Sequence, residues 1–320
     1  MIEPTLADLQ ASVQDRLAFN SLADYVSLCS SYLALLERTN PTRIVSPTHP
    51  NYIFYQYDET HSHRITRPLN THLFIENEQS FLDAFERCAS FLDELKIHQE
   101  RMAERPASTQ FMRSNTINKV VYTMQQSIGS IGDSFPNPNQ SRKRIGQLFE
   151  HLIRLIIQRV GFECQSRTID IPIPDYTGYH MSYELDVVFS RNKAILMSET
   201  EYIHSSEIVG SVKTTSKDRL DKIFIDKYLL NKLLGRNIPV VAIFLHDVQR
   251  AQRGNSIFGI NSTFKSNHFL GYTVALNKLD GIYYVDPRPE MLVNERLREQ
   301  IADFQQFLVK DMWLMSEPAQ

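Results

Sequence analysis

Two acidic side chains stand close together on one short apolar segment of the sequence. Glu184 and Asp186 lie in Tyr183-Glu-Leu-Asp-Val-Val-Phe189, a run with the residue types of a strand. Because side chains two apart share a face of a strand, the two carboxylates are expected side by side, where they repel each other. Mg²⁺ prefers oxygen ligands, and a cation between the two would remove this conflict. The alternative is an edge strand with a solvated acidic face.

A lysine ends a later predicted strand of the chain. Lys213 follows the apolar residues of a strand expected at 207–213 and precedes Thr-Thr and a helix expected at 217–234. An ammonium group near the carboxylates can orient an attacking water and offset charge on a phosphorane-like transition state. A lysine at a strand end is usually only solvated. The order of helix glutamate, strand carboxylates and strand lysine favours the catalytic interpretation here.

The helix glutamate of this series is Glu150, in a helix expected at about 142–160. It lies in line with Ile153 and Ile157 rather than opposite the apolar stripe. A carboxylate on a half-buried line loses solvation unless a partner or a cation meets it. An ion pair with Arg154 is the simpler alternative for Glu150 alone.

The elements that must position these residues form an α/β pattern. A mostly helical N-terminal region, residues 1–130, is predicted to precede a core over 131–320, with the boundary in the turn-rich residues 129–140. The alternation in the core predicts a mixed sheet flanked by helices. In the N-terminal region we expect helices at 5–37, 79–104 and 107–128 and a strand at 51–57. In the core we expect strands at 164–173, 182–189, 193–198, 207–213 and 238–245, a hairpin of 272–276 with 281–285, and a C-terminal helix at 290–314.

Composition sets bounds on the class of protein. The 320 residues carry a net charge of −3, which is unusual for a nonspecific nucleic-acid binder but allows a positive cleft. Between residues 213 and 236, basic side chains outnumber acidic ones. Three widely spaced cysteines suit a reducing compartment. With no signal peptide and no long apolar run in the sequence, we expect a cytoplasmic enzyme.

The placement of Glu150, Asp186 and Lys213 resembles the PD-(D/E)xK nuclease superfamily. Two stretches within roughly 135–250 resemble type II restriction endonucleases that recognise CCGG or CCNGG cores. One is Gln140-Ser-Arg-Lys-Arg-Ile-Gly-Gln-Leu-Phe-Glu150, and the other is Lys213-Thr-Thr-Ser-Lys217-Asp218-Arg219. The resemblance implies a restriction-endonuclease-like core and a Mg²⁺-dependent, homodimeric enzyme of a restriction–modification system that cleaves double-stranded DNA.

The resemblance also implies residues for base recognition. Lys217, Asp218 and Arg219 match the triplet that reads C·G pairs, and Arg and Asp suit guanine and cytosine edges. Gln140 and Arg142 would add base or phosphate contacts, with a polar linker as the alternative. The implied site has a CCNGG core, cut before its first C with the central base flipped out. TCCNGGA is a candidate longer site.

Two departures from the family pattern concern the triplet and the metal site. Lys217 stands where relatives have Arg, so a bidentate contact to guanine is in doubt. Ser211 stands where the superfamily usually has a carboxylate, and relatives with this gap use a Glu thirteen or fourteen residues after the Lys. Asp226 lies thirteen residues after Lys213. Its side chain is one carbon shorter, so from the sequence we favour Glu184 over Asp226 as the second metal ligand beside Asp186.

Two other functions remain open at this point. A repair or junction-resolving nuclease shares the same core but does not need the Lys-Asp-Arg triplet. A non-catalytic DNA-binding module would use the carboxylates only in ion pairs.

Overall fold

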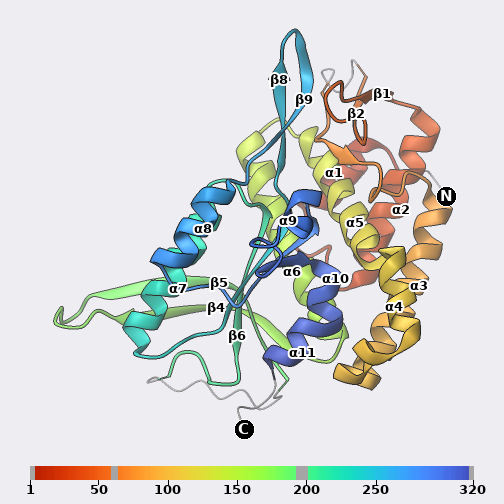
Figure 1. The fold of residues 1–320 in the computed structure, drawn as a ribbon. Helices are drawn as coiled ribbons and strands as arrows, with labels where there is room; N and C mark the ends of the chain where they lie inside the picture. The colour runs from red at the N-terminus through yellow and green to blue at the C-terminus, as the bar shows by residue number, and fades with distance from the viewer. Residues whose placement is uncertain (1–3, 59–63, 192–200, 317–320) are drawn as a thin grey trace. The chain divides into compact units, whose positions relative to one another are not determined.

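The computed structural model describes residues 4–58, 64–191 and 201–316, in which helices combine with a mixed sheet (Figure 1). The chain divides into two compact units. Unit 1 comprises Met1–Phe91, Gln110–Leu152 and Asp247–Thr263, and unit 2 comprises Leu92–Thr109, Ile153–His246 and Phe264–Gln320. These units alternate along the chain, whereas the sequence suggested one boundary near residue 130. Within the described residues, no helix has the length and apolar character to cross a bilayer.

Unit 1 is built around one almost fully buried helix, α5 (Thr116–Asp133). The amphipathic helices α1 (Leu6–Gln14) and α2 (Leu22–Thr39) pack against it, and the Thr5–Asp8 capping box fixes the start of α1. The expected helix at 5–37 is therefore two helices. The expected helices at 79–104 and 107–128, which include residues of both units, are also divided, into α3 (Glu78–His98), the 3₁₀ turn η2 (Gln99–Glu104), α4 (Pro106–Ser114) and α5.

Small antiparallel sheets complete unit 1. β1 (Thr42–Val45), β2 (Tyr52–Gln56) and β3 (Leu69–Asn70) form one, and β2 confirms the strand expected at 51–57. The hairpin of β8 (Val248–Arg253) and β9 (Ser256–Ser262) was not expected from the sequence. Its turn residues, Gly254 and Asn255, are a known hairpin signal, and Gly254 has φ +56°.

Unit 2 contains the main sheet, whose strand order is β11-β10-β7-β6-β5-β4. The sheet is mixed: β4, β5 and β6 are antiparallel neighbours, and β6, β7, β10 and β11 are parallel. β7 is buried along its whole length, as its unbroken apolar sequence predicts. The strands are β4 (Glu163–Pro172), β5 (His180–Ser190), β6 (Ile208–Thr215), β7 (Val240–His246), β10 (Gly281–Asp286) and β11 (Ile301–Asp303).

Helical elements cover both faces of this sheet. On one face, α7 (Leu220–Leu234) and α8 (Ser266–Ala275) share a core with Val188, and Phe224 contacts Phe269. On the other face, Phe189 contacts Phe162 and Phe307, and Phe162 contacts Trp313. The prediction of a mixed sheet flanked by helices is therefore confirmed.

The C-terminal third differs from the prediction in two places. Residues 272–276 do not form a hairpin with 281–285: they belong to α8, and β10 pairs in parallel with β7 and β11. Short apolar runs do not distinguish strand from helix by themselves, and here Phe269 and Tyr272 both contact Phe224 from one helix face. The helix expected at 290–314 is broken, because Asn294 accepts hydrogen bonds from the backbone of the turn before β11. The pieces are α9 (Pro289–Val293), β11, α10 (Phe304–Gln306), a π-helical turn (Phe307–Asp311) and α11 (Met312–Met315).

The turn-rich residues 129–140 are mostly helical. α5 continues to Asp133, and α6 (Pro138–Arg159) begins only a few residues later. The glycines in this stretch serve close packing, because a Cβ on Gly129 would meet the Arg67 side chain and one on Gly132 would meet Ile145. The strand expected at 193–198 lies outside the described residues.

Candidate active site

The Asp186 carboxylate lies where two strands of unit 2 separate. β5 and β6 pair from Phe189 to Val187, and the register given for this pair ends there. Immediately beyond, Asp186 Oδ2 accepts a hydrogen bond from the backbone N–H of Val212 at 2.8 Å. The side chain therefore reaches sideways to β6, where it takes a donor that the strand ladder would otherwise satisfy.

Lys213 meets the same carboxylate oxygen. Its Nζ lies 2.6 Å from Asp186 Oδ2, and the Ser211 hydroxyl donates to that oxygen at 3.3 Å. The Lys213 side chain is 30% exposed and the Asp186 side chain 13% exposed, so the pair is partly screened from solvent and still accessible. Among the described residues, Asp186 Oδ1 accepts no hydrogen bond, which leaves this oxygen available to a ligand.

Asp226 is electrostatically linked to this pair from α7. Burial raises the pKa of Asp226, Lys222 opposes the rise, the negative charge of Asp186 adds to it, and Lys213 lowers it again. The half-buried side chain forms no hydrogen bond or ion pair within the described part of the chain. Asp226 also influences Tyr183, whose pKa burial raises to about 12 with a further contribution from this carboxylate. A carboxylate without a hydrogen bond, close enough to feel both Asp186 and Lys213, fits a cation ligand.

Glu184 does not follow simply from strand parity. Leu185 pairs with Arg167 and Val188 with Gln165, so β5 has one extra residue between these pairs. Such a bulge changes the alternation of faces, and Leu185 and Val188 accordingly share one core cluster. Glu184 itself is exposed, and no interaction with Asp186 is observed.

The donor set fits a Mg²⁺ ion that keeps most of its water. No group of three or more His, Cys, Asp or Glu side chains is arranged for a metal within residues 4–58, 64–191 and 201–316. Mg²⁺ is commonly held by one or two carboxylates, with water and substrate phosphate completing the shell. Asp186 and Asp226 supply two carboxylates of this kind.

Glu150 belongs to unit 1 and is half-exposed on α6. The apolar stripe predicted for this helix is buried, and Ile153 and Ile157, in line with Glu150, are also fully buried. The environment is therefore the half-buried line that the sequence predicts. The joining of Glu150 with the carboxylates of unit 2 stays a prediction.

The Lys217-Asp218-Arg219 triplet lies before α7. The sequence suggested that the triplet would open this helix, and the structure differs. α7 begins at Leu220 with Arg219 as its N-cap, and the triplet forms an exposed turn in which Asp218 has φ +51°. The turn is held by hydrogen bonds from the Lys217 N–H to Thr215 Oγ1 and from the Arg219 N–H to the Ser216 carbonyl. All three side chains lie at the surface, close in sequence to Lys213.

Gln140 and Arg142 lie inside α6, not before it, because this helix begins at Pro138. Both are exposed on its first turns. The Asn137 side chain accepts hydrogen bonds from the N–H groups of residues 139 and 140, which explains the early start.

Comparison with known proteins agrees with this architecture. No protein-family profile matches the sequence, and a search of curated proteins found no match. A solved structure, the crystal structure of the Type IIP restriction endonuclease Kpn2I, matches with a TM-score of 0.65 at 16% sequence identity, covering 97% of each chain. The fold is restriction-endonuclease-like. At this identity the likeness concerns the fold, and the strands that carry Asp186 and Lys213 belong to its central sheet.

Proposed function

We propose that this protein is a Mg²⁺-dependent type II restriction endonuclease that hydrolyses double-stranded DNA at a short palindrome-like site. The observation that carries the proposal is the contact between Lys213 Nζ and Asp186 Oδ2, with Asp226 within electrostatic range of both. The restriction-endonuclease-like fold supports the same conclusion, because the two residues lie on adjacent strands of its sheet.

The roles of the side chains follow from their chemistry. Asp186 and Asp226 would hold the cation, and Glu150 would complete or tune its surroundings. Bound Mg²⁺ would supply Lewis acidity that offsets charge on the scissile phosphate and favours attack by water. Lys213 donates hydrogen bonds, so it can orient the water and stabilise developing negative charge on the phosphate. We prefer Asp226 to Glu184 because Asp226 is half-buried and linked to the Asp186–Lys213 pair, whereas Glu184 is exposed.

Sequence recognition is assigned to the exposed turn before α7. Asp218 can accept from cytosine N4, Arg219 can fork onto guanine, and Lys217 offers a single ammonium in place of a guanidinium. Gln140 and Arg142 are further candidates for base or phosphate contacts. The proposed recognition site has a CCNGG core, with TCCNGGA as the longer candidate.

A homodimer is the proposed assembly. A palindrome-like site has two symmetry-related scissile phosphates, and a twofold dimer supplies one site per strand.

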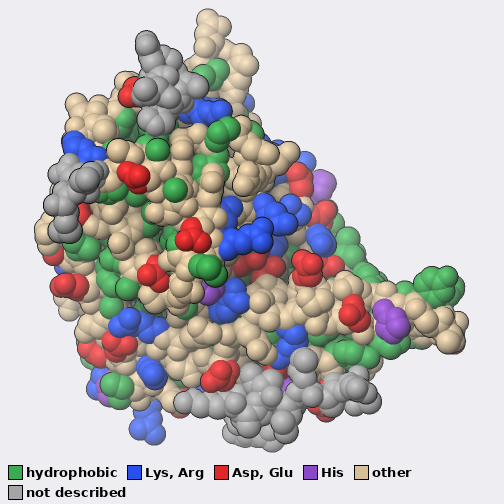
Figure 2. All heavy atoms as spheres, turned by 180° about the vertical axis from the view of Figure 1, so that it is seen from behind, with side chains coloured by type: hydrophobic (Ala, Val, Ile, Leu, Met, Phe, Trp, Pro, Cys, Tyr) green, Lys and Arg blue, Asp and Glu red, His purple; other side chains and the backbone are tan. Residues whose placement is uncertain are grey.

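A local concentration of positive charge suits DNA as a partner. On the face drawn in Figure 2, Lys and Arg side chains gather in a compact patch, although the net charge is −3.

Two alternative functions are each supported by one observation. A non-catalytic DNA-binding module would use its carboxylates in ion pairs, and the Asp186–Lys213 contact is such a pair. Asp226 argues against that module, because this half-buried carboxylate forms no ion pair within the described residues and burial raises its pKa, which is more typical of a functional site than of an ion-paired surface. A repair or junction-resolving nuclease would share the fold without needing specific readout.

A plasmid assay separates these functions. Supercoiled plasmid with one TCCNGGA site is incubated with the protein in Mg²⁺ or in EDTA, beside a plasmid without CCNGG. The proposal expects linear product only with Mg²⁺ and only from the plasmid with the site. A binding module leaves both plasmids supercoiled, and a repair or junction nuclease cuts without regard to the site.

A further inference from the structure

Unit 1 contains a cavity of about 460 Å³ whose polar lining is dominated by arginine. Its walls come from segments far apart in the sequence: residues 64–67, residues 132–145 and the β8–β9 hairpin. The charged lining residues are Arg64, Arg67, Arg142, Arg250 and Asp133. Nothing in the proposed catalytic site uses Arg64, Arg67 or Arg250.

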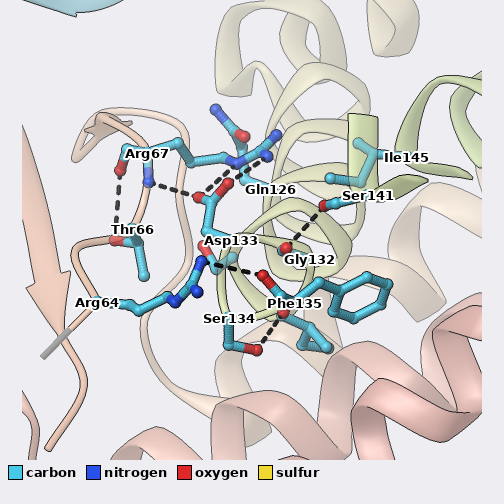
Figure 3. Close-up of polar contacts among 12 residues, drawn as sticks. Arg64, Thr66, Arg67, Gln126, Gly132, Asp133, Ser134, Phe135, Ser141 and Ile145 are labelled. Carbon is cyan, nitrogen blue, oxygen red and sulfur yellow. Dashed lines mark hydrogen bonds and ion pairs between the residues drawn. The ribbon is translucent and has the colours of Figure 1, made fainter. Parts of the chain in front are cut away.

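The single carboxylate of the cavity neutralises only one arginine. Asp133 accepts hydrogen bonds from the Arg67 backbone N–H at 2.8 Å, from Nε at 3.1 Å and from Nη2 at 2.9 Å (Figure 3). Arg64, Arg142 and Arg250 form no ion pair within the described residues. The cavity therefore carries excess positive charge in a protein whose net charge is −3.

Two of the guanidinium groups are held in place. The Arg67 side chain lies against Gly129, where a Cβ would collide with it, and both its Nε and its Nη2 donate hydrogen bonds to the Asp133 carboxylate. Arg64 Nη1 donates to the Phe135 carbonyl at 3.0 Å, while the other donors of this guanidinium form no hydrogen bond among the described residues (Figure 3). Groups that are already ordered lose less entropy when an anion binds.

The start of α6 adds positive potential to the same cavity. Pro138 and Arg142 line it, and α6 is 22 residues long, so its aligned peptide dipoles favour an anion at this end. Arg142 and the exposed Arg250 side chain can move towards a ligand, because neither forms a side-chain hydrogen bond within the described chain.

We propose that this cavity binds a phosphate group of the DNA backbone, as an anchoring contact separate from the catalytic residues and from the exposed turn before α7. Guanidinium groups match phosphate through paired N–H donors, and beside the Arg67–Asp133 pair the cavity presents three arginines that form no ion pair within the described residues. The assignment to DNA rests on the proposed nuclease function. A free phosphate compound has the same chemistry and is the source from which the test must distinguish DNA.

The test measures DNA affinity without catalysis. Arg250→Ala, Arg64→Ala and the double variant are titrated in EDTA with fluorescent duplexes, one containing TCCNGGA and one of random sequence. Arg113→Ala is the matched control, because Arg113 is exposed on α4 in the same unit and lines no part of the cavity. Arg250→Ala is the primary variant, since the exposed Arg250 side chain forms no hydrogen bond or ion pair within the described residues. Thermal unfolding checks each protein.

We expect the double variant to bind both duplexes about tenfold more weakly, the size expected for a lost charged contact. The slope of log affinity against log salt should fall by about 0.9, which corresponds to one phosphate. Affinities equal to those of Arg113→Ala would overturn the proposal, and so would a loss confined to the TCCNGGA duplex, which indicates base readout.

Calorimetric titration with inorganic phosphate distinguishes the two sources. Phosphate binding that Arg250→Ala abolishes, together with unchanged DNA affinity, would assign the cavity to a free phosphate compound and overturn the DNA contact. Failure of the phosphate anchor can be distinguished from failure of the proposed nuclease function. Wild-type protein that cuts DNA while the variants bind normally refutes the anchor alone, and wild-type protein that binds no DNA refutes both.

Discussion

Replacing Asp226 with Asn separates the role of this carboxylate in function from its role in folding. The substitution keeps the shape of the side chain and removes its charge. If Asp226 holds the cation with Asp186, cleavage should fall at least ~10²-fold, the range seen when one electrostatic contributor to a transition state is removed. Glu184→Gln is the matched control, because it removes the exposed carboxylate on β5 in the same isosteric way.

The same variant should be more stable than the wild type when Mg²⁺ is absent. Burial raises the pKa of Asp226 in the folded chain above the usual 3.8, so ionisation of this carboxyl weakens folding. The destabilisation is fully present above the folded pKa and disappears below 3.8, where the folded and unfolded chains are both protonated. Half-burial limits the effect to a fraction of a kcal/mol, or about 1–2 °C in Tm.

Two assays together decide whether Asp226 or Glu184 is the second metal ligand. Mg²⁺-dependent cleavage rates are measured for both variants, with DNA binding as a control, and thermal unfolding is followed in EDTA at pH 7 and pH 3.5. We expect Asp226→Asn to be inactive and slightly stabilised at pH 7 but not at pH 3.5, and Glu184→Gln to cut within a few-fold of wild type. An active Asp226→Asn with an inactive Glu184→Gln would contradict the assignment of Asp226 and make Glu184 the second ligand.

Three further predictions concern helix α6, the exposed turn and the core. Glu150→Gln should fold normally and lose at least ~10²-fold in cleavage rate; unchanged turnover in a variant of normal Tm would make Glu150 a helix-flank residue. Asp218→Ala or Arg219→Ala should weaken cognate binding by about 1–3 kcal/mol and spare random DNA, and equal losses in an anisotropy titration would contradict base readout. Arg167 and Glu207 form a doubly hydrogen-bonded pair with side chains 4% and 0% exposed. Arg167→Met should therefore lower the free energy of unfolding by about 3–5 kcal/mol in urea denaturation, and a loss below about 1 kcal/mol would mean that Glu207 finds another partner.

The sequence predicts the chemistry of the site better than its geometry. Asp186 and Lys213 stand out because a carboxylate and an ammonium on otherwise apolar strands have no packing role, and the structure brings them together. The sideways reach of Asp186 to Val212 depends on where β5 and β6 separate, and the bulge beside it depends on pairing with β4. The alternation of side chains along a strand predicts neither the contact of Asp186 with Val212 nor the bulge, and for this reason the sequence favoured Glu184.

The remaining differences between the sequence-based predictions and the structure depend on contacts between residues that are far apart in the sequence. The alternation of helix and strand predicted the mixed sheet, because each element carries its own periodicity. The helix α8 was not predicted, because its short apolar run fits a strand equally well. The contacts of Phe269 and Tyr272 with Phe224, which favour the helix, are not visible in the sequence. The arginine cavity was missed for a similar reason: Arg64, Arg142 and Arg250 are scattered in the sequence and meet only in the fold.

Mapping the ends of cleaved DNA shows whether this protein cuts at a specific site and whether Asp186 and Lys213 are needed for the cut. A DNA of known sequence is digested in Mg²⁺ with wild-type protein, Asp186→Ala and Lys213→Ala, and every terminus is sequenced. We expect wild-type ends at one short palindrome-like site with a CCNGG core, and no more than a few per cent cutting by either variant, both of which still bind the site. Wild-type ends scattered without a common sequence, or site-specific cutting that survives in either variant, would contradict it.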